Sequence, residues 1–262
     1  MNLLEAIILA IVQGITEWLP ISSSGHLVLI QHYLGITASV FFDIILHAGT
    51  LPAVLVAFRK DILEILKALS ESGFKTEQGK LGLYVIVGSI PTAIIGFAFQ
   101  TIFESFFSNL LVVGFAFIGT GVLLYISKLQ KNRDSRLDST RAVLIGTAQG
   151  IALIPGVSRS GSTISTGLLL KLKREKAFQF SFLLFIPAVI GAALAEGVKE
   201  WGSLTVAYLD LPAVFVGIVV TSLVSYVFLR LLLKIIVREK FHWFAYYCWA
   251  LGTLVVIAQI LK

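Results

Sequence analysis

Residues Gln13–His26 read QGITEWLPISSSGH and place a carboxylate, three consecutive hydroxyls and an imidazole inside a strongly hydrophobic stretch. Polar and ionisable groups are costly at membrane depth and are usually functional there. A second stretch, Gln149–Thr163, reads QGIALIPGVSRSGST, and a shift of 136 positions aligns Ser22 with Ser158. The two stretches therefore predict a chain built from two related halves, each with one polar interruption.

The composition is that of an integral membrane protein. Of 262 residues, 57% are hydrophobic and 14% are charged, and the mean hydropathy is +0.91. Globular domains average about 25% charged residues. Six apolar runs are long enough to cross a hydrocarbon core of about 30 Å, and we expect a transmembrane helix in each: Phe41–Phe58, Leu81–Gln100, Leu110–Ser127, Phe178–Leu194, Leu211–Leu229 and Phe241–Ile260.

The two motif-bearing segments, Leu3–Leu34 and Ala142–Leu170, differ from these runs. Each has two apolar arms separated by a Pro/Ser/Gly interruption, and each arm is short for a full crossing. We predict two re-entrant helix-loop-helix hairpins, because irregular backbone is tolerated at membrane depth where protein or a watery cavity surrounds it. If either segment instead crossed the membrane twice, the chain would still return to the side from which it entered. The orientation of the remaining spans would therefore be the same.

Positive charge predicts the orientation. The stretches 59–80, 128–141, 171–176 and 230–240 fall on one side and hold 18 of the 21 Lys and Arg residues. The positive-inside rule puts this side in the cytoplasm and both termini on the outer face. The net charge of +6 comes mainly from these short loops, so we do not expect nucleic-acid binding.

This topology makes each half one hairpin plus three spans, so the second half is inserted upside down relative to the first. Inverted repeats with broken helices are a common way to build a site within a membrane. We predict an all-α fold of six transmembrane helices and two re-entrant hairpins in an inverted-topology repeat. Repeat one covers residues 1–130, a polar cytoplasmic linker 131–139 and repeat two 140–262. The alternative is chance recurrence of small-residue patterns in apolar sequence.

In the first hairpin, Gln13 and Glu17 lie four residues apart and share a helix face. Pro20 ends that helix, and the serines that follow, Ser22, Ser23 and Ser24, can cap the next arm. One interpretation is that they are caps alone. The presence of Glu17 and His26 beside them favours a site.

Arg159 is the most informative residue of the second hairpin. An arginine at membrane depth costs at least about 2.5 kcal/mol, so we expect an anionic partner. Glu17 is one candidate, and a phosphate matches the guanidinium fork better. The helix that follows offers its N-terminal N–H groups to an anion. The predicted phosphate-binding residues are Ser22, Ser24, Ser158, Arg159, Ser160, Gly161 and Thr163.

Asp43 and His47, also four residues apart, leave two interpretations open. They either orient groups of the site or line its entrance, or they form a satisfied pair near a membrane end.

The two hydroxyl-lined turns each lie at the start of a helix. If they face each other, they can bind phosphate oxygens between them. Hydrolysis of a phosphoanhydride needs an attacking group, charge neutralisation and leaving-group stabilisation. His26 and Ser23 are candidates for nucleophile or base, and Glu17 for a ligand of a divalent cation or a proton carrier. Mg²⁺ favours carboxylate, phosphate and water oxygens. The substrate we expect is a lipid phosphate entering sideways from the bilayer.

The chain resembles the undecaprenyl pyrophosphate phosphatase family, also known as the bacitracin-resistance family, over essentially its full length. That family's (E/Q)xxxE motif appears as Gln13 to Glu17, followed by LPISSSGH, and its PGxSRSxxT motif appears as Pro155 to Thr163. The resemblance implies a metal-dependent phosphatase of the bacterial plasma membrane. It would convert undecaprenyl diphosphate to the monophosphate at a site open to the outer face, recycling the carrier lipid for cell-wall synthesis.

Carried onto this sequence, the resemblance implies four catalytic residues, namely Glu17, His26, Ser23 and Arg159. It implies Mg²⁺ or Ca²⁺ as the cation, with Glu17 and Gln13 as the metal ligands. Because the first motif position is Gln13 and not Glu, Glu17 would carry this role nearly alone.

The attacking group stays open between a serine, His26 and metal-bound water. A homodimer is an open option for the assembly. The alternative function is a transporter or flippase for a polyprenyl phosphate lipid, which the inverted repeat also permits.

Overall fold

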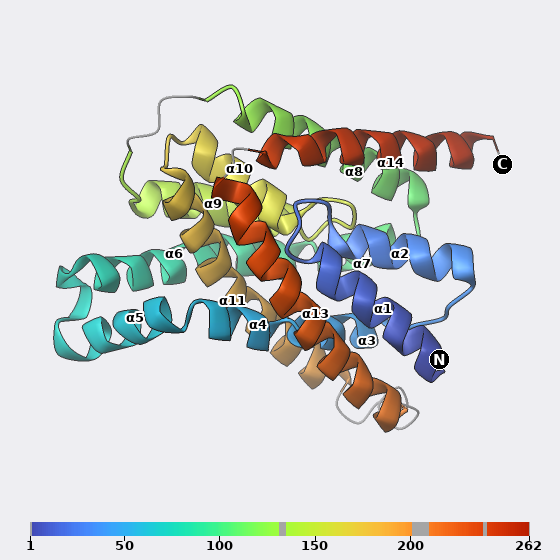
Figure 1. The fold of residues 1–262 in the computed structure, drawn as a ribbon, viewed down its shortest axis with the longest axis horizontal. Coiled ribbons are helices and arrows are strands. Elements are labelled where there is room, and N and C mark those ends of the chain that lie inside the picture. The colour runs from blue at the N-terminus through green and yellow to red at the C-terminus, as the bar shows by residue number, and fades with distance from the viewer. Residues whose placement is uncertain (1, 131–134, 201–209, 238–239, 262) are drawn as a thin grey trace.

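The protein is described by a computed structural model that covers residues 2–130, 135–200, 210–237 and 240–261. In this part of the chain every named element is a helix (Figure 1). In chain order the elements are α1 (Leu3–Thr16), α2 (Ser23–Leu34), α3 (Val40–Ala48), α4 (Leu51–Ala57), α5 (Arg59–Glu71), η1 (Gly73–Lys75), α6 (Glu77–Ala98), α7 (Gln100–Phe106), α8 (Leu110–Ser127), α9 (Ser139–Ile151), α10 (Arg159–Leu169), α11 (Arg174–Glu200), α13 (Leu211–Val237), η2 (Phe241–Trp243) and α14 (Phe244–Ile260).

The membrane-spanning class predicted from composition is confirmed. Five helical stretches of the described chain are long and apolar enough to cross a membrane, namely α6, α8, α11, α13 and the run from η2 through α14. The 22 residues of α6 measure about 33 Å at 1.5 Å per residue, which matches a hydrocarbon core. The protein is therefore a multi-pass membrane protein.

The sixth expected span, Phe41–Phe58, is not one continuous helix. It consists of α3 and α4, which are separated at Gly49 and Thr50, and the chain then bends by 78° into α5. Pro52 lies in the first turn of α4 and has no N–H to donate to the preceding turn, so the helical hydrogen bonding is interrupted there. A sixth span is present only if this bent segment is counted as one.

Both motif-bearing segments form two short helices around a break, as predicted. Helices α1 and α2 have 14 and 12 residues, and α9 and α10 have 13 and 11. The second helix of each pair opens at Ser23 or at Arg159, and the same shift of 136 relates these two positions. Their re-entrance from one membrane face stays a prediction.

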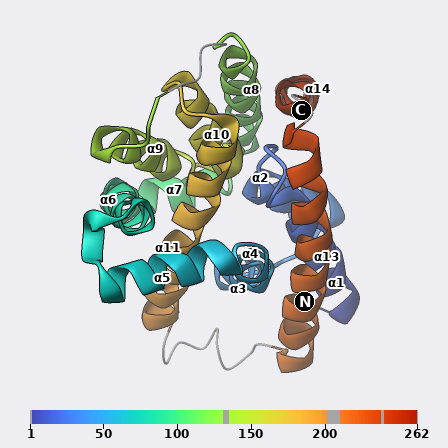
Figure 2. The same ribbon diagram turned by 60° about the vertical axis from the view of Figure 1, so that its left-hand side comes forward.

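Helices of one predicted half pack against helices of the other. Helix α1 packs against α13, α9 packs against α6, and α8 lies beside α14 (Figures 1 and 2). Each hairpin thus places its first arm on a span of the other half, an arrangement that supports a duplication. The repeat boundaries stay a prediction, and residues 131–134 of the proposed linker lie outside the described residues.

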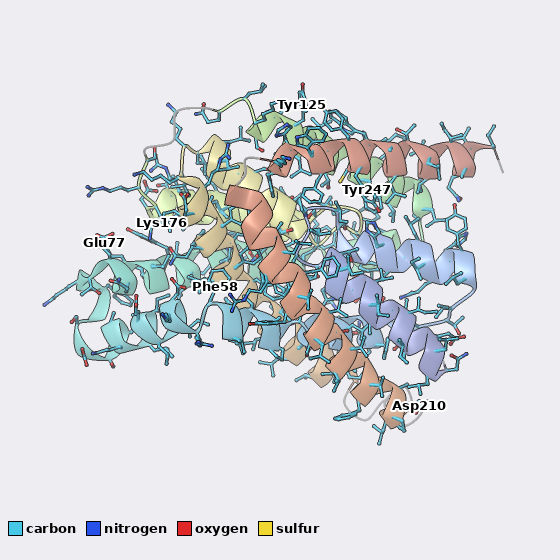
Figure 3. The ribbon with its side chains drawn as sticks, viewed as in Figure 1. Phe58, Glu77, Tyr125, Lys176, Asp210 and Tyr247 are labelled. Carbon is cyan, nitrogen blue, oxygen red and sulfur yellow. The ribbon has the colours of Figure 1, made fainter. Side chains whose placement is uncertain are left out.

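The two ends of the chain lie on the same side of the molecule, at the right of Figure 1. Glu77 and Lys176 lie at the opposite side (Figure 3). This arrangement fits both termini facing one side of a membrane, and which side is cytoplasmic stays a prediction from charge.

The two breaks touch each other through glycine backbone. A Cβ atom on Gly25 would lie 2.9 Å from the Cα atom of Gly156 and 2.6 Å from the Phe117 ring. Gly156 itself has φ +97°, and a Cβ atom there would lie 2.5 Å from the carbonyl oxygen of Val113. Both the positive φ and the close approach require glycine at this position.

We predict that Gly156→Ala destabilises the folded protein by about 1–3 kcal/mol, because alanine adds backbone strain and a steric clash. Thermal unfolding in detergent measures this as a lower midpoint. The matched control is Gly119→Ala on α8, where a Cβ atom would meet nothing within 4 Å. Equal midpoints for the two variants would contradict the prediction.

Candidate active site

A buried ion pair joins the two breaks. The Arg159 guanidinium donates from Nη2 to Oε1 of Glu17 at 2.6 Å, and the two side chains are only 14% and 4% exposed. Glu17 caps the end of α1, and Arg159 is the first residue of α10. The sequence predicted this partner for Arg159 as one of two candidates.

The second carboxylate oxygen of Glu17 accepts two further hydrogen bonds. The Gln13 amide donates to Oε2 from one turn earlier on α1, at 2.9 Å. The Ser23 hydroxyl donates to the same oxygen at 2.6 Å from the start of α2. Donors on both oxygens stabilise the ionised carboxylate at a buried position, and Ser23 presents its hydroxyl at the carboxylate.

Arg159 keeps one unused donor in the cluster. Its guanidinium carbon lies 3.9 Å from the centre of the Phe185 ring, a cation–π contact, and Trp18 packs edge-on against Phe185 at 5.3 Å. Its Nη1 atom is buried, with no hydrogen-bond partner among the described residues. A buried charged donor without a partner is costly, so this atom is suited to an incoming anion.

Hydroxyl groups hold the two breaks together. Ser22 accepts a hydrogen bond from the Gly156 backbone N–H at 3.1 Å, and Ser160 donates to the Leu19 carbonyl at 3.2 Å. Ser22 has φ +66°, a value that is uncommon outside glycine and that persists where the surroundings fix the conformation.

The remaining predicted phosphate-binding residues also have partners within the protein. Ser22 accepts from the Gly25 N–H at 3.3 Å, and Ser158 accepts from the Gly161 N–H at 3.0 Å, so these two serines are equivalent helix caps. Ser24 lies 3.3 Å from Ser22, and Ser160 lies 3.3 Å from Ser158.

Thr163 completes this set from one turn into α10. It donates to the Arg159 carbonyl at 2.9 Å and lies 2.5 Å from the Ser181 hydroxyl. Phosphate contacts of all these residues stay predictions.

His26 faces a residue that sequence reasoning missed. Its Nδ1 atom bonds the Ser22 carbonyl at 2.7 Å, its Nε2 atom lies 2.7 Å from the Tyr247 hydroxyl, and the two rings stack. A carbonyl only accepts, so Nδ1 carries a proton, and Nε2 shares a hydrogen bond with the Tyr247 hydroxyl. Both ring nitrogens are thus engaged away from Glu17. Tyr247 is 221 positions from His26, and no local pattern links them.

His47 does reach the cluster. Its Nε2 atom lies 3.4 Å from Glu17 Oε2 and 3.5 Å from Ser23 Oγ. Of the two interpretations that the sequence left open, the structure supports the one that places His47 beside the site. The break between α3 and α4 begins at Gly49, two residues after His47.

The oxygen atoms around Glu17 fit a divalent cation in part. Gln13 Oε1 is buried with no hydrogen-bond partner in the part of the chain described, and it belongs to the amide that bonds Glu17. Amide and carboxylate oxygens are ligands that Mg²⁺ and Ca²⁺ accept. The described residues contain no group of three His, Cys, Asp or Glu side chains able to hold a metal. A cation would therefore complete its ligands with phosphate and water oxygens.

The fold and the site together define a multi-pass helical membrane protein in which Glu17, Ser23 and Arg159 form a buried polar cluster between two helix breaks. Residues 6–254 match the family described as Bacitracin resistance protein BacA. An undecaprenyl-diphosphatase of Carboxydothermus hydrogenoformans is 42% identical over 99% of this chain and 98% of its own.

Two further relatives carry the same name. One, of Korarchaeum cryptofilum, is 42% identical over 96% of this chain and 97% of its own. The other, of Methanobrevibacter smithii, is 37% identical over 99% of each chain. The chain belongs to the bacitracin resistance protein BacA family.

We predict that Glu17→Gln lowers stability by about 3–5 kcal/mol, because it leaves the buried Arg159 charge without its counter-ion. The double variant Glu17→Gln with Arg159→Gln should recover part of this loss, and thermal unfolding in detergent measures both. The exposed pair of Lys199 and Glu104 provides the control, since Glu104→Gln should change the midpoint little. Strictly additive losses in the double variant would argue against a coupled pair.

Proposed function

We propose that this protein hydrolyses undecaprenyl diphosphate to undecaprenyl phosphate and inorganic phosphate. The observation that carries the proposal is the cluster of Glu17, Ser23 and Arg159, in which a hydroxyl lies on a carboxylate and a guanidinium keeps a buried donor unused. Membership of the BacA family and relatives named undecaprenyl-diphosphatase support it. Hydrolysis would recycle the carrier lipid for cell-wall synthesis.

In this proposal Arg159 binds the diphosphate. Its Nη1 atom donates to a phosphate oxygen while Nη2 stays on Glu17, so that the two terminal nitrogens each bind an anionic group. The positive charge is then placed where negative charge increases in the transition state, and no reorganisation is needed at the moment of reaction. The N-termini of α2 and α10, which open at Ser23 and Arg159, add favourable dipoles at the same place.

Ser23 is the proposed attacking group, and Glu17 its base. The Ser23 O–H bond breaks, its proton passes to Glu17 Oε2, and Oγ forms a bond to the terminal phosphorus. The bridging P–O bond breaks, and undecaprenyl phosphate leaves. A water molecule then attacks the phosphoserine and its P–Oγ bond breaks. Glu17 returns its proton to Oγ, which restores the hydroxyl and the carboxylate, and inorganic phosphate leaves with both protons of the water. The 2.6 Å hydrogen bond from Ser23 to Glu17 supports this assignment over His26.

A divalent cation, Mg²⁺ or Ca²⁺, is part of the proposal. Glu17 and Gln13 Oε1 would hold it. When bound, it would neutralise charge on the phosphate oxygens.

The cellular setting also belongs to the proposal. We place the protein in the bacterial plasma membrane with its site open to the outer face, as its resemblance to the family implies. The charge distribution favours both termini on that same face. Membrane lipids surround its apolar helices. Both breaks of the site come from one chain, so the reaction needs no second copy, and a homodimer stays a prediction.

We predict that Ser23→Ala and Arg159→Ala each reduce phosphate release from a long-chain polyprenyl diphosphate in detergent by at least about 100-fold, the scale of losing one electrostatic or nucleophilic group. Acid quenching of wild type with a labelled terminal phosphate should trap phosphoserine, and Ser23→Ala should trap none. Near-normal rates in Ser23→Ala would exclude the serine as nucleophile. Lipid translocation in proteoliposomes without any phosphate release would support the flippase alternative.

A chelator should abolish phosphate release by the wild type, and Mg²⁺ or Ca²⁺ added in excess should restore it. The reason is that one carboxylate and one amide bind a cation weakly and reversibly. Release rates measured across a series of free-metal concentrations test this. A rate that does not change with chelator would contradict the metal requirement.

A further inference from the structure

His47 is fixed in one orientation at the end of α3. Its Nδ1 atom lies 2.8 Å from the Asp43 carbonyl oxygen, one turn earlier. Because a carbonyl only accepts, Nδ1 carries a proton, and Nε2 is the nitrogen that faces Glu17 and Ser23.

The surroundings of His47 hold this orientation from several sides. The Thr50 hydroxyl donates to the His47 carbonyl at 2.6 Å, and Ser222 on α13 donates to the Gly49 carbonyl at 2.6 Å. The buried Asp43 carboxylate accepts two hydrogen bonds from the Gln31 amide of α2, at 2.8 and 3.0 Å. The break in this span is therefore tied both to α13 and to the first hairpin.

Nε2 lies beside the hydrogen bond that the proposed reaction uses. It is 3.4 Å from Glu17 Oε2 and 3.5 Å from Ser23 Oγ, the two atoms that share the serine proton. The His47 side chain is 26% exposed against 4% for Glu17. His47 therefore lies on the more open side of the cluster.

His47 belongs to the half that supplies the carboxylate and the hydroxyl. A shift of 135 relates LPAV at 51–54 to IPAV at 186–189, and the same shift takes His47 to Phe182. Phe182 is fully buried and packs against Trp18. The imidazole thus corresponds to a buried apolar side chain in the second half.

We propose that His47 is a positioning residue for the reaction. In this role the imidazole carries a proton on Nε2 as well and donates to Glu17 Oε2, next to the Ser23 hydroxyl that is bonded to the same oxygen. The contact keeps that hydroxyl on Glu17 and aligned with the terminal phosphate. This inference rests on the proposed phosphatase function and adds a residue to it. Because the contact is to the attacking group and its base, its loss should slow the chemical step and leave substrate binding nearly unchanged.

The experiment compares phosphate release by wild type, His47→Ala and His47→Gln over a range of polyprenyl diphosphate concentrations. We expect His47→Ala to lower kcat by about 10–100-fold, with KM changed less than about threefold. His47→Gln should recover most of the rate, because its amide can hydrogen-bond at the Nε2 position. His32→Ala is the control, since His32 is exposed on α2 and contacts Tyr33, and its rate should equal that of wild type.

Wild-type protein that releases no phosphate would refute the proposed function itself. With an active wild type, three results would overturn the role of His47. They are an unchanged kcat in His47→Ala, a raised KM with normal kcat, and a folded His47→Gln as slow as His47→Ala. If His47→Ala does not fold, the kcat and KM of His47→Gln decide.

Discussion

The ion pair between Glu17 and Arg159 is the interaction on which the site depends. Each charge is buried in a largely apolar molecule, and each would be costly without the other. Because the two residues come from different hairpins, their pairing fixes how the breaks meet. The hydrogen bonds from Gly156 to Ser22 and from Ser160 to the Leu19 carbonyl then join the backbones on either side.

The two breaks supply different chemistry to one place. Under the shift of 136, Ser23 corresponds to Arg159, and Glu17 corresponds to Leu153. The first break thus provides the hydroxyl and the carboxylate, whereas the second provides the cation. Their serine caps have stayed alike, since Ser22 and Ser158 each accept from the glycine N–H three residues later. Two breaks with similar serine caps and unlike side chains thus form one site where they meet.

Much of this could be predicted from the sequence, for identifiable reasons. The hairpins are local, and Pro20, Pro155 and the serine caps mark their breaks. The cost of a buried charge predicted an anionic partner for Arg159, and Glu17 was one of the two candidates. The break in Phe41–Phe58 was missed because hydropathy measures only how apolar a segment is. It carries no information on the backbone hydrogen bond that Pro52 cannot donate. The partners Tyr247 and Phe185 were missed because tertiary packing alone brings them to the site.

The most direct test of the central claim is an experimental structure with a non-hydrolysable lipid diphosphate bound. We expect the terminal phosphate between the two breaks, with Arg159 Nη1 on a phosphate oxygen and Ser23 Oγ facing the phosphorus. We also expect Arg159 to stay in contact with Glu17. A diphosphate bound elsewhere, with the pair of Glu17 and Arg159 untouched and sealed from the ligand, would contradict it.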